Sequence, residues 1–156
     1  MHIALLLAFI IGLVTGLRSM TGPALVAWAA HSGWLNLAGS PLAFIGSTAA
    51  VAILTLGALG EFVADKLPRT PARTSAFPLI FRVVAGGFAG ACIAVAGGGS
   101  MVGGAMAGAI GAVAGAFGGY SIRAALVKAF GVRDLMVAIP EDLIAIGAGL
   151  FAVSRY

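Results

Sequence analysis

The chain consists of long apolar stretches that are interrupted by short polar or glycine-rich segments. The hydrocarbon core of a bilayer is about 30 Å thick, so a helix that crosses it needs roughly 20 mostly apolar residues. Stretches near or above that length occur at residues 3–17, 41–60, 83–122 and 135–154. The third is long enough for two spans, and the glycine run at 97–99 divides it into a helical hairpin. The pattern therefore predicts about five transmembrane helices.

The ends of these stretches carry helix signals. Pro41 suits the first turn of the second helix, and Pro140, followed by two acidic residues, suits the start of the fifth. The first stretch, 3–17, is short, and a cleaved signal peptide is the competing interpretation. No Lys or Arg precedes that stretch and no A-x-A-like site follows it, which favours a retained helix.

Two segments between the spans, 18–40 and 119–134, are too interrupted to cross a membrane. We expect them to form interfacial or re-entrant half-helices, and Trp28 and Trp34 suit a headgroup position. The expected fold is thus an all-α polytopic membrane protein, with residues 1–156 in one integral membrane domain.

Composition supports this fold class and excludes others. Hydrophobic residues make up 61% of the 156 positions and charged residues 9%, whereas soluble domains carry about 25% charged residues. A disulfide scaffold is excluded because the chain has one cysteine, Cys92. Disorder is excluded because charged and polar residues are scarce.

Basic residues set the expected orientation. In a five-span arrangement Arg18 and Arg155 fall on one side, and the other seven Lys and Arg residues fall opposite: Lys66, Arg69, Arg73, Arg82, Arg123, Lys128 and Arg133. Because cytoplasmic loops are enriched in Lys and Arg, this predicts a bacterial inner-membrane protein with its N-terminus cytoplasmic and its C-terminus outside. The net charge of +4 then needs no nucleic-acid partner.

The fourth span, 101–119, contains three small-xxx-small steps, at Gly104/Gly108, Gly111/Gly115 and Gly115/Gly119. Such steps let membrane helices approach closely. They serve either packing within one protomer or a homo-oligomer seam along this helix.

The two ends of the chain also show weak similarity. Short matches relate residues 1–66 to 101–156, with 83–98 as a linking helix. The odd number of spans would invert the second half, and inverted repeats with broken elements are typical of transporters.

Four acidic residues lie near one end of the predicted helices. Glu61 and Asp65 are four positions apart and share a helix face, and Glu141 and Asp142 open the fifth helix on the same side. In a structural role they would pair with Arg82, Arg123 or Arg133 and fix the helix ends. In a functional role, paired carboxylates would load and release a proton, or oxygen ligands would hold a hard cation.

Arg18 lies in the helix-breaking segment 16–23, next to Ser19. A permanent cation beside hydroxyls and free amides suits an anion or a lipid phosphate, whereas the alternative is snorkelling to the headgroups. Arg123, two positions after Ser121, is the analogous residue in the second half.

Other chemistry has no motif. His2 and His31 have no companion motif, and the chain shows no Ser-His-Asp set, HExxH or CxxC. We expect no metal, no cofactor and no enzymatic activity.

Short motifs give a family resemblance: GLRS at 16–19, the Glu61–Pro68 segment, Arg82 before the glycine-rich hairpin, and PED at 140–142. They resemble a bacterial multi-pass membrane family of unknown function, over nearly the whole chain. The resemblance implies a small inner-membrane protein and no activity. Lipid-carrier flippases, which also place Arg in broken membrane segments, are a looser likeness.

These observations predict a small transport protein that moves an ion or a small anionic solute, with proton or cation coupling. One alternative is a non-transporting scaffold or partner-binding module, and another is a lipid-phosphate flippase. Membrane lipid and a second copy of the chain are the expected partners.

Overall fold

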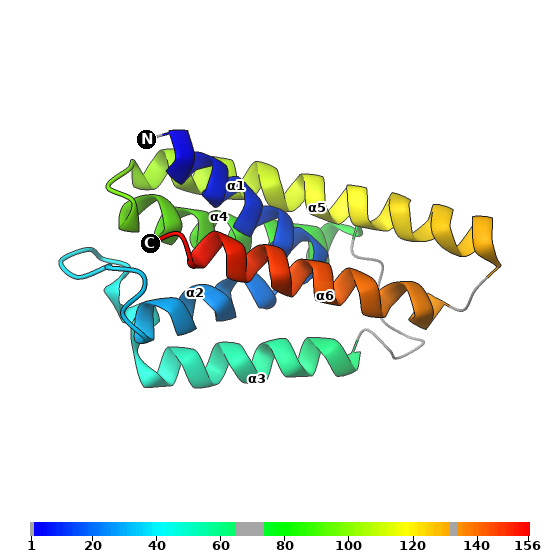
Figure 1. Cartoon of the computed structure of the whole chain (residues 1–156), viewed down its shortest axis with the longest axis horizontal. Helices are drawn as coiled ribbons and strands as arrows, with labels where there is room; N and C mark the ends of the chain where they lie inside the picture. Colours follow the sequence, from blue (N-terminus) through cyan, green and yellow to red (C-terminus); the bar gives the residue numbers. More distant parts are fainter. Residues whose placement is uncertain (1, 65–73, 132–133) are drawn as a thin grey trace.

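The computed structural model describes residues 2–64, 74–131 and 134–156. Within them every regular element is a helix, so the predicted all-α class is confirmed. The six α-helices lie roughly along one long axis (Figure 1). The elements are α1 (His2–Leu17), α2 (Thr21–His31), the 3-10 helix η1 (Ala43–Gly46), α3 (Thr48–Ala64), α4 (Ala76–Ala96), α5 (Met101–Phe130) and α6 (Asp134–Val153).

Helix length and composition suit a membrane. Among the described residues three helices are long and apolar enough to cross one: α4, α5 and residues Met136–Val153 of α6. α1 and α3 are apolar but shorter, and α2 has only 11 residues. The chain is therefore suited to a bilayer, with three helices that reach the length of a full span.

Glycines set the close packing of α1, α4 and α5, the helices with the most extensive mutual contacts. A methyl group on Gly108 of α5 would overlap the backbone of Gly86 in α4, and one on Gly12 of α1 would overlap Gly108. Gly115 faces the backbone of Leu13 in the same way. The small-residue stripe of α5 is thus used for packing within the chain, which was one of its two interpretations. A homo-oligomer through this helix stays a prediction.

Two helices begin at other positions than predicted. The second apolar helix begins at Thr48 and not at Pro41, because η1 intervenes and the Ser47 hydroxyl accepts a hydrogen bond from the Ala50 N–H at 3.2 Å. α6 begins at Asp134 and holds Pro140 in its interior. A proline there removes the hydrogen bond to the carbonyl four residues earlier, so α6 has a weak point near Pro140.

The half-helix predicted within 119–134 is not a separate element. α5 continues to Phe130 and ends at Gly131, whose φ of +59° suits glycine. Residues 120–130 contain no glycine or proline, so nothing interrupts the helix before Gly131. The other predicted half-helix is present as α2.

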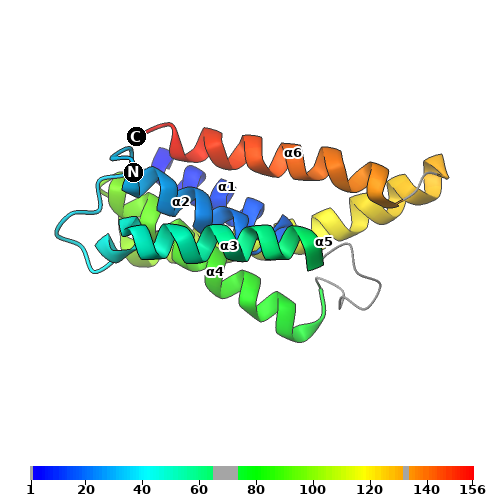
Figure 2. The ribbon, with the colours of Figure 1, turned by 90° about the horizontal axis from the view of Figure 1, so that it is seen from below.

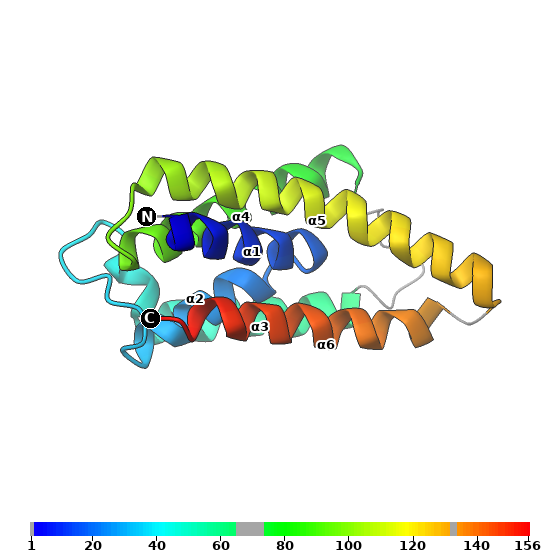
Figure 3. The same ribbon diagram turned by 45° about the horizontal axis from the view of Figure 1, so that its top comes forward.

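α1 and α2 form a helical hairpin whose turn, at residues 18–20, lies inside the bundle beside α3 and α6 (Figures 1 and 2). Arg18 in this turn binds Asp142 of α6, so it lies at the same level of the bundle as that acid and as Arg82, which donates to the Leu17 carbonyl. α2 returns beside α1, and both termini lie at one end of the bundle (Figure 3). The side of a membrane on which Arg18 lies stays a prediction.

The inverted repeat gains no support from the path of the chain. α1 and α5 would correspond in the two halves, yet they run in the same direction, since Gly12 packs at Gly108 and Gly16 at Ala112. Inverted elements would run in opposite directions.

Candidate functional site

Charged side chains gather around the α1–α2 turn. Arg18 donates from Nε to Oδ1 of Asp142 at 2.6 Å, and its guanidinium lies 4.6 Å from the centre of the Phe62 ring. The Arg18 side chain is 5% exposed and that of Asp142 is 15% exposed. The pair is therefore a buried ion pair that joins α1 to α6, and it is not bathed by solvent.

Glu61 caps the start of α2. Its Oε1 accepts hydrogen bonds from the N–H and the hydroxyl of Ser19, at 2.7 and 2.6 Å, and its Oε2 accepts one from the Met20 N–H at 2.9 Å. The first N–H groups of a helix have no partner within the helix, and they favour a negative charge. Ser19 and Met20 directly precede Thr21, the first residue of α2, so Glu61 of α3 satisfies backbone donors of the turn and places a negative charge near the start of that helix.

Arg82 performs the complementary task at the end of α1. Its Nη1 donates to the carbonyl oxygens of Gly16 and Leu17, at 3.1 and 3.3 Å, and its Nη2 lies 3.5 Å from Oε1 of Glu61. Cations favour the carboxyl end of a helix for the same electrostatic reason. Arg82 and Glu61 together make a helix break possible inside the bundle, where backbone groups have no water to bind.

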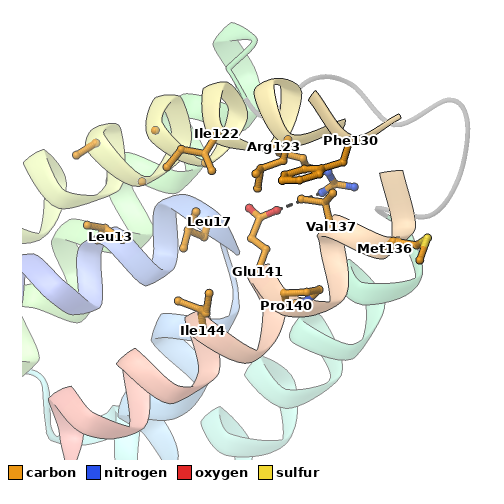
Figure 4. A pocket seen from close by; sticks show the side chains of 15 residues that line it. Leu13, Leu17, Ile122, Arg123, Phe130, Met136, Val137, Pro140, Glu141 and Ile144 are labelled. Atoms are coloured by element: carbon orange, nitrogen blue, oxygen red, sulfur yellow. Dashed lines mark hydrogen bonds and ion pairs between the residues drawn. The ribbon is translucent and has the colours of Figure 1, made fainter. Parts of the chain in front are cut away.

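A second ion pair lies farther along α5 and α6. Nη1 of Arg123 and Oε2 of Glu141 are 3.5 Å apart, and their side chains are 17% and 14% exposed. Figure 4 shows Glu141 pointing from α6 toward Arg123 on α5, with apolar side chains on both sides. Adjacent acids of α6 thus bind different arginines, because Asp142 binds Arg18.

The Arg123–Glu141 pair lines a cavity of about 530 Å³ between α1, α5 and α6, here named the α5–α6 cavity. Apart from these two residues its walls are apolar or glycine. The other lining residues are Leu13, Leu17, Ala114, Gly115, Gly118, Gly119, Ile122, Leu126, Phe130, Met136, Val137, Pro140 and Ile144.

The predicted site residues thus separate into two groups. Arg18, Ser19, Glu61, Arg82 and Asp142 meet at the α1–α2 turn, and Arg123 meets Glu141 in the cavity. Ser121 is exposed on α5, and Asp65 lies outside the described residues.

In the described part of the chain, no three His, Cys, Asp or Glu side chains cluster closely enough to hold a metal ion. Asp65, one of the four acids considered for a cation, lies outside that part, so the cation alternative stays a prediction. Each of Glu61, Glu141 and Asp142 faces an arginine instead.

The sequence did not reveal the backbone groups of this site. The N–H groups of Ser19 and Met20 and the carbonyls of Gly16 and Leu17 are as important as the charges. A signal was present in Gly16 and Pro23, which mark a helix break, and Gly22 packs against Thr15 where a Cβ would overlap its hydroxyl.

A family model described as "Domain of unknown function (DUF4126)" matches residues 5–155. The chain belongs to the DUF4126 family. This match confirms the resemblance to a family of unknown function, and it includes both ion-pair groups of this DUF4126 protein. Comparisons with curated proteins and with solved structures gave no match.

Proposed function

We propose that this DUF4126 protein is a small membrane transport protein that moves an anionic solute, and that Arg123 binds the anion. The observation that carries the proposal is the Arg123–Glu141 pair in the wall of an apolar cavity of about 530 Å³. Ligand sites are commonly apolar cavities of about 300–1,000 Å³ with a few polar groups, which this cavity matches.

The two ion-pair groups differ in the parts of the chain that they contact. Glu61 and Arg82 cap broken helix ends, so their charges have a structural reason. Arg123 and Glu141 lie within α5 and α6, and their ion pair lines a cavity. A buried ion pair is a weak source of stability, because desolvation offsets its attraction. The Arg123–Glu141 pair is therefore the better candidate for function.

The distances in the two groups favour the same assignment. Arg18 and Asp142 make a hydrogen bond of 2.6 Å, whereas Arg123 and Glu141 are 3.5 Å apart, at the limit of hydrogen bonding. A guanidinium binds carboxylate and phosphate groups through a planar set of donors. An incoming anion would displace Glu141 from Arg123, while Asp142 continues to hold α6 on Arg18.

Displacement supplies a coupling to protons. Glu141 is the carboxylate that the anion displaces, so in this proposal it is the group through which anion binding is coupled to a proton. Pro140 directly precedes Glu141 and weakens α6 there, which allows the first turns of α6 to move relative to α5.

The ionised groups lie at membrane depth in the arrangement that we propose. At about 1.5 Å per residue, Asp142 is about 17 Å from the Val153 end of α6, and Arg82 about 21 Å from the Ala96 end of α4. Both distances are shorter than the hydrocarbon thickness of about 30 Å. If those helix ends lie at one bilayer surface, the turn at Arg18 lies within the hydrocarbon region.

With the charged groups at this depth, the helices would cross the bilayer in a different arrangement from the five-span one predicted from the sequence. α3, α4, α5 and α6 would cross the bilayer of a bacterial inner membrane, while α1 and α2 would enter it as a re-entrant hairpin. The segments that join α3 to α4 and α5 to α6 carry Lys66, Arg69, Arg73 and Arg133 in sequence, so that end is the cytoplasmic one. Both described ends of the chain would then face outside.

A scaffold without transport is the second candidate. It is favoured by the contacts of Glu61, because its carboxylate already accepts three hydrogen bonds from the α1–α2 turn and lies beside one arginine. In a scaffold the Arg123–Glu141 pair would be a third polar contact that holds helices together. The two candidates differ in whether an anion moves.

The test is a flux assay in sealed proteoliposomes that contain a pH-sensitive dye, with gradients of chloride, phosphate and acetate applied in turn. We expect an anion-dependent proton flux that is abolished in Arg123→Gln and Glu141→Gln. The matched control is Arg155→Gln, since Arg155 stacks on Phe151 at 4.5 Å and is far from the cavity. Equal flux in all folded variants, or none above empty liposomes with any anion or with the amphiphile described next, would overturn transport.

A further inference from the structure

We infer that the α5–α6 cavity binds an amphiphile, with its anionic headgroup on Arg123 and its hydrocarbon chain between α5 and α6. The inference names the solute class of the site in the proposed function and rests on that function for transport, although binding is measured separately. It is argued from the walls of the cavity, its opening and its charges.

The walls are much more extensive than a small anion requires. An ion such as chloride needs donors on several sides, yet Arg123 is the one basic side chain among the lining residues. Apart from Arg123 and Glu141, the lining residues are apolar or glycine. A hydrocarbon chain fills such a space through many van der Waals contacts, which a small ion cannot make.

The cavity is bounded by side chains that are largely exposed. Ile122 and Phe130 of α5 are 62% and 71% exposed, and Met136 and Ile144 of α6 are 62% and 66% exposed. α5 contacts α6 far less extensively than it contacts α1 and α4, although the two helices approach each other toward the end where α5 leads into α6 (Figure 3). In a bilayer these side chains face lipid, so a chain can enter sideways while its headgroup approaches Arg123.

The charges determine which headgroup fits. Glu141 already occupies Arg123, so an anion can exchange with it, whereas a neutral headgroup gives the guanidinium nothing in return. A phosphate monoester provides the oxygens that a guanidinium binds in a forked geometry. The occupant is therefore a single- or double-chain lipid with a negatively charged phosphate or carboxylate.

Gly118 allows the cavity to be filled without disturbing the bundle. It lines the cavity, and a Cβ placed on it meets no atom within 4 Å. Gly147 of α6 also has open space around its Cβ position, but it does not line the cavity. Gly118→Leu therefore blocks the cavity, and Gly147→Leu is a control with the same change of residue.

The experiment measures equilibrium binding of four probes to the full chain in a non-ionic detergent: radiolabelled monododecyl phosphate, dioleoyl phosphatidic acid, dioleoyl phosphatidylcholine and inorganic phosphate. We expect the two anionic amphiphiles to bind at least tenfold more tightly than phosphatidylcholine or inorganic phosphate. Gly118→Leu and Arg123→Gln should each weaken that binding about tenfold or more, and Gly147→Leu and Arg155→Gln should leave it unchanged. Ellipticity and elution volume establish that each variant is folded.

The outcomes separate this inference from transport. If inorganic phosphate binds as tightly as monododecyl phosphate, or if Gly118→Leu binds like the parent chain, the amphiphile inference is overturned and transport of a small anion stands. Equal binding of phosphatidylcholine also overturns it. If the anionic amphiphiles bind through Arg123 but neither they nor small anions move in proteoliposomes, the inference stands and transport is overturned.

Discussion

Glu61 and Arg82 lie 3.5 Å apart and bind opposite sides of the same helix break. Glu61 accepts hydrogen bonds from the N–H groups of the turn just before α2, and Arg82 donates to the carbonyls that close α1. Each charge therefore has a backbone partner and an oppositely charged partner. This arrangement explains how an apolar bundle holds a turn at residues 18–20 in its interior.

We predict that Glu61→Gln destabilises the fold by about 1–3 kcal/mol, because the amide removes the charge and turns a donor toward N–H groups that need an acceptor. Thermal unfolding of the detergent-solubilised chain measures the change. The matched control is Glu141→Gln, which removes the same charge from a carboxylate that lies 3.5 Å from Arg123, and it should cost less. A larger loss for Glu141→Gln would contradict the capping role.

The Arg18–Asp142 pair gives a second prediction. Arg18→Met and Asp142→Leu should each destabilise the chain, and the double variant should lose less than the sum of the two. Directly bonded residues commonly show an interaction energy of about 0.5–3 kcal/mol in such a cycle. Additive losses would mean that the two side chains stabilise the chain independently, in spite of their 2.6 Å hydrogen bond.

Glycine packing gives a third prediction. Gly108→Ala should destabilise the bundle by about 1–3 kcal/mol or prevent folding, because the new methyl group meets the backbone of Gly86 and Gly90. Gly118→Ala on the same helix should be neutral or stabilising by up to about 1 kcal/mol, since alanine is the better helix former. Unfolding temperatures of the two variants in one detergent provide the comparison. Equal losses would mean that close approach at Gly108 is not what holds α4 and α5 together.

Much of the fold could be predicted from the sequence because apolar runs were its strongest signal. Residues 3–17, 41–60 and 83–122 led to α1, α3, α4 and most of α5. The end of α5 was missed because Arg123 and Lys128 interrupt the apolar run, although they do not interrupt a helix. The search for apolar stretches measured hydrophobicity, whereas the continuation of a helix depends on the helix propensity of each residue.

The charged residues of the candidate site could be predicted from the sequence, but the ion pairs that they form could not. Charges are rare in this chain, so each was conspicuous, and Arg18, Glu61, Arg82, Arg123, Glu141 and Asp142 were all identified. Which acid meets which arginine depends on contacts across up to 124 positions in sequence. The proximity of Arg18 to Asp142 was missed because the five-span count treated residues 3–17 as a span and did not include α2.

The re-entrant hairpin gives the last prediction, which concerns the sides of the membrane. In a Cys92→Ala background, Asn36→Cys and Ser154→Cys place a thiol at one end of the bundle, whereas Ser75→Cys places one at the start of α4 (Figures 1 and 2). We expect a membrane-impermeant maleimide to label the first two in intact spheroplasts and to label Ser75→Cys after permeabilisation. If Asn36→Cys and Ser154→Cys label from opposite sides, at least one helix crosses the bilayer in a way that the re-entrant arrangement does not allow. The Arg18–Asp142 bond would then have to join groups that the bilayer separates, and the arrangement proposed for the charged turn would fail.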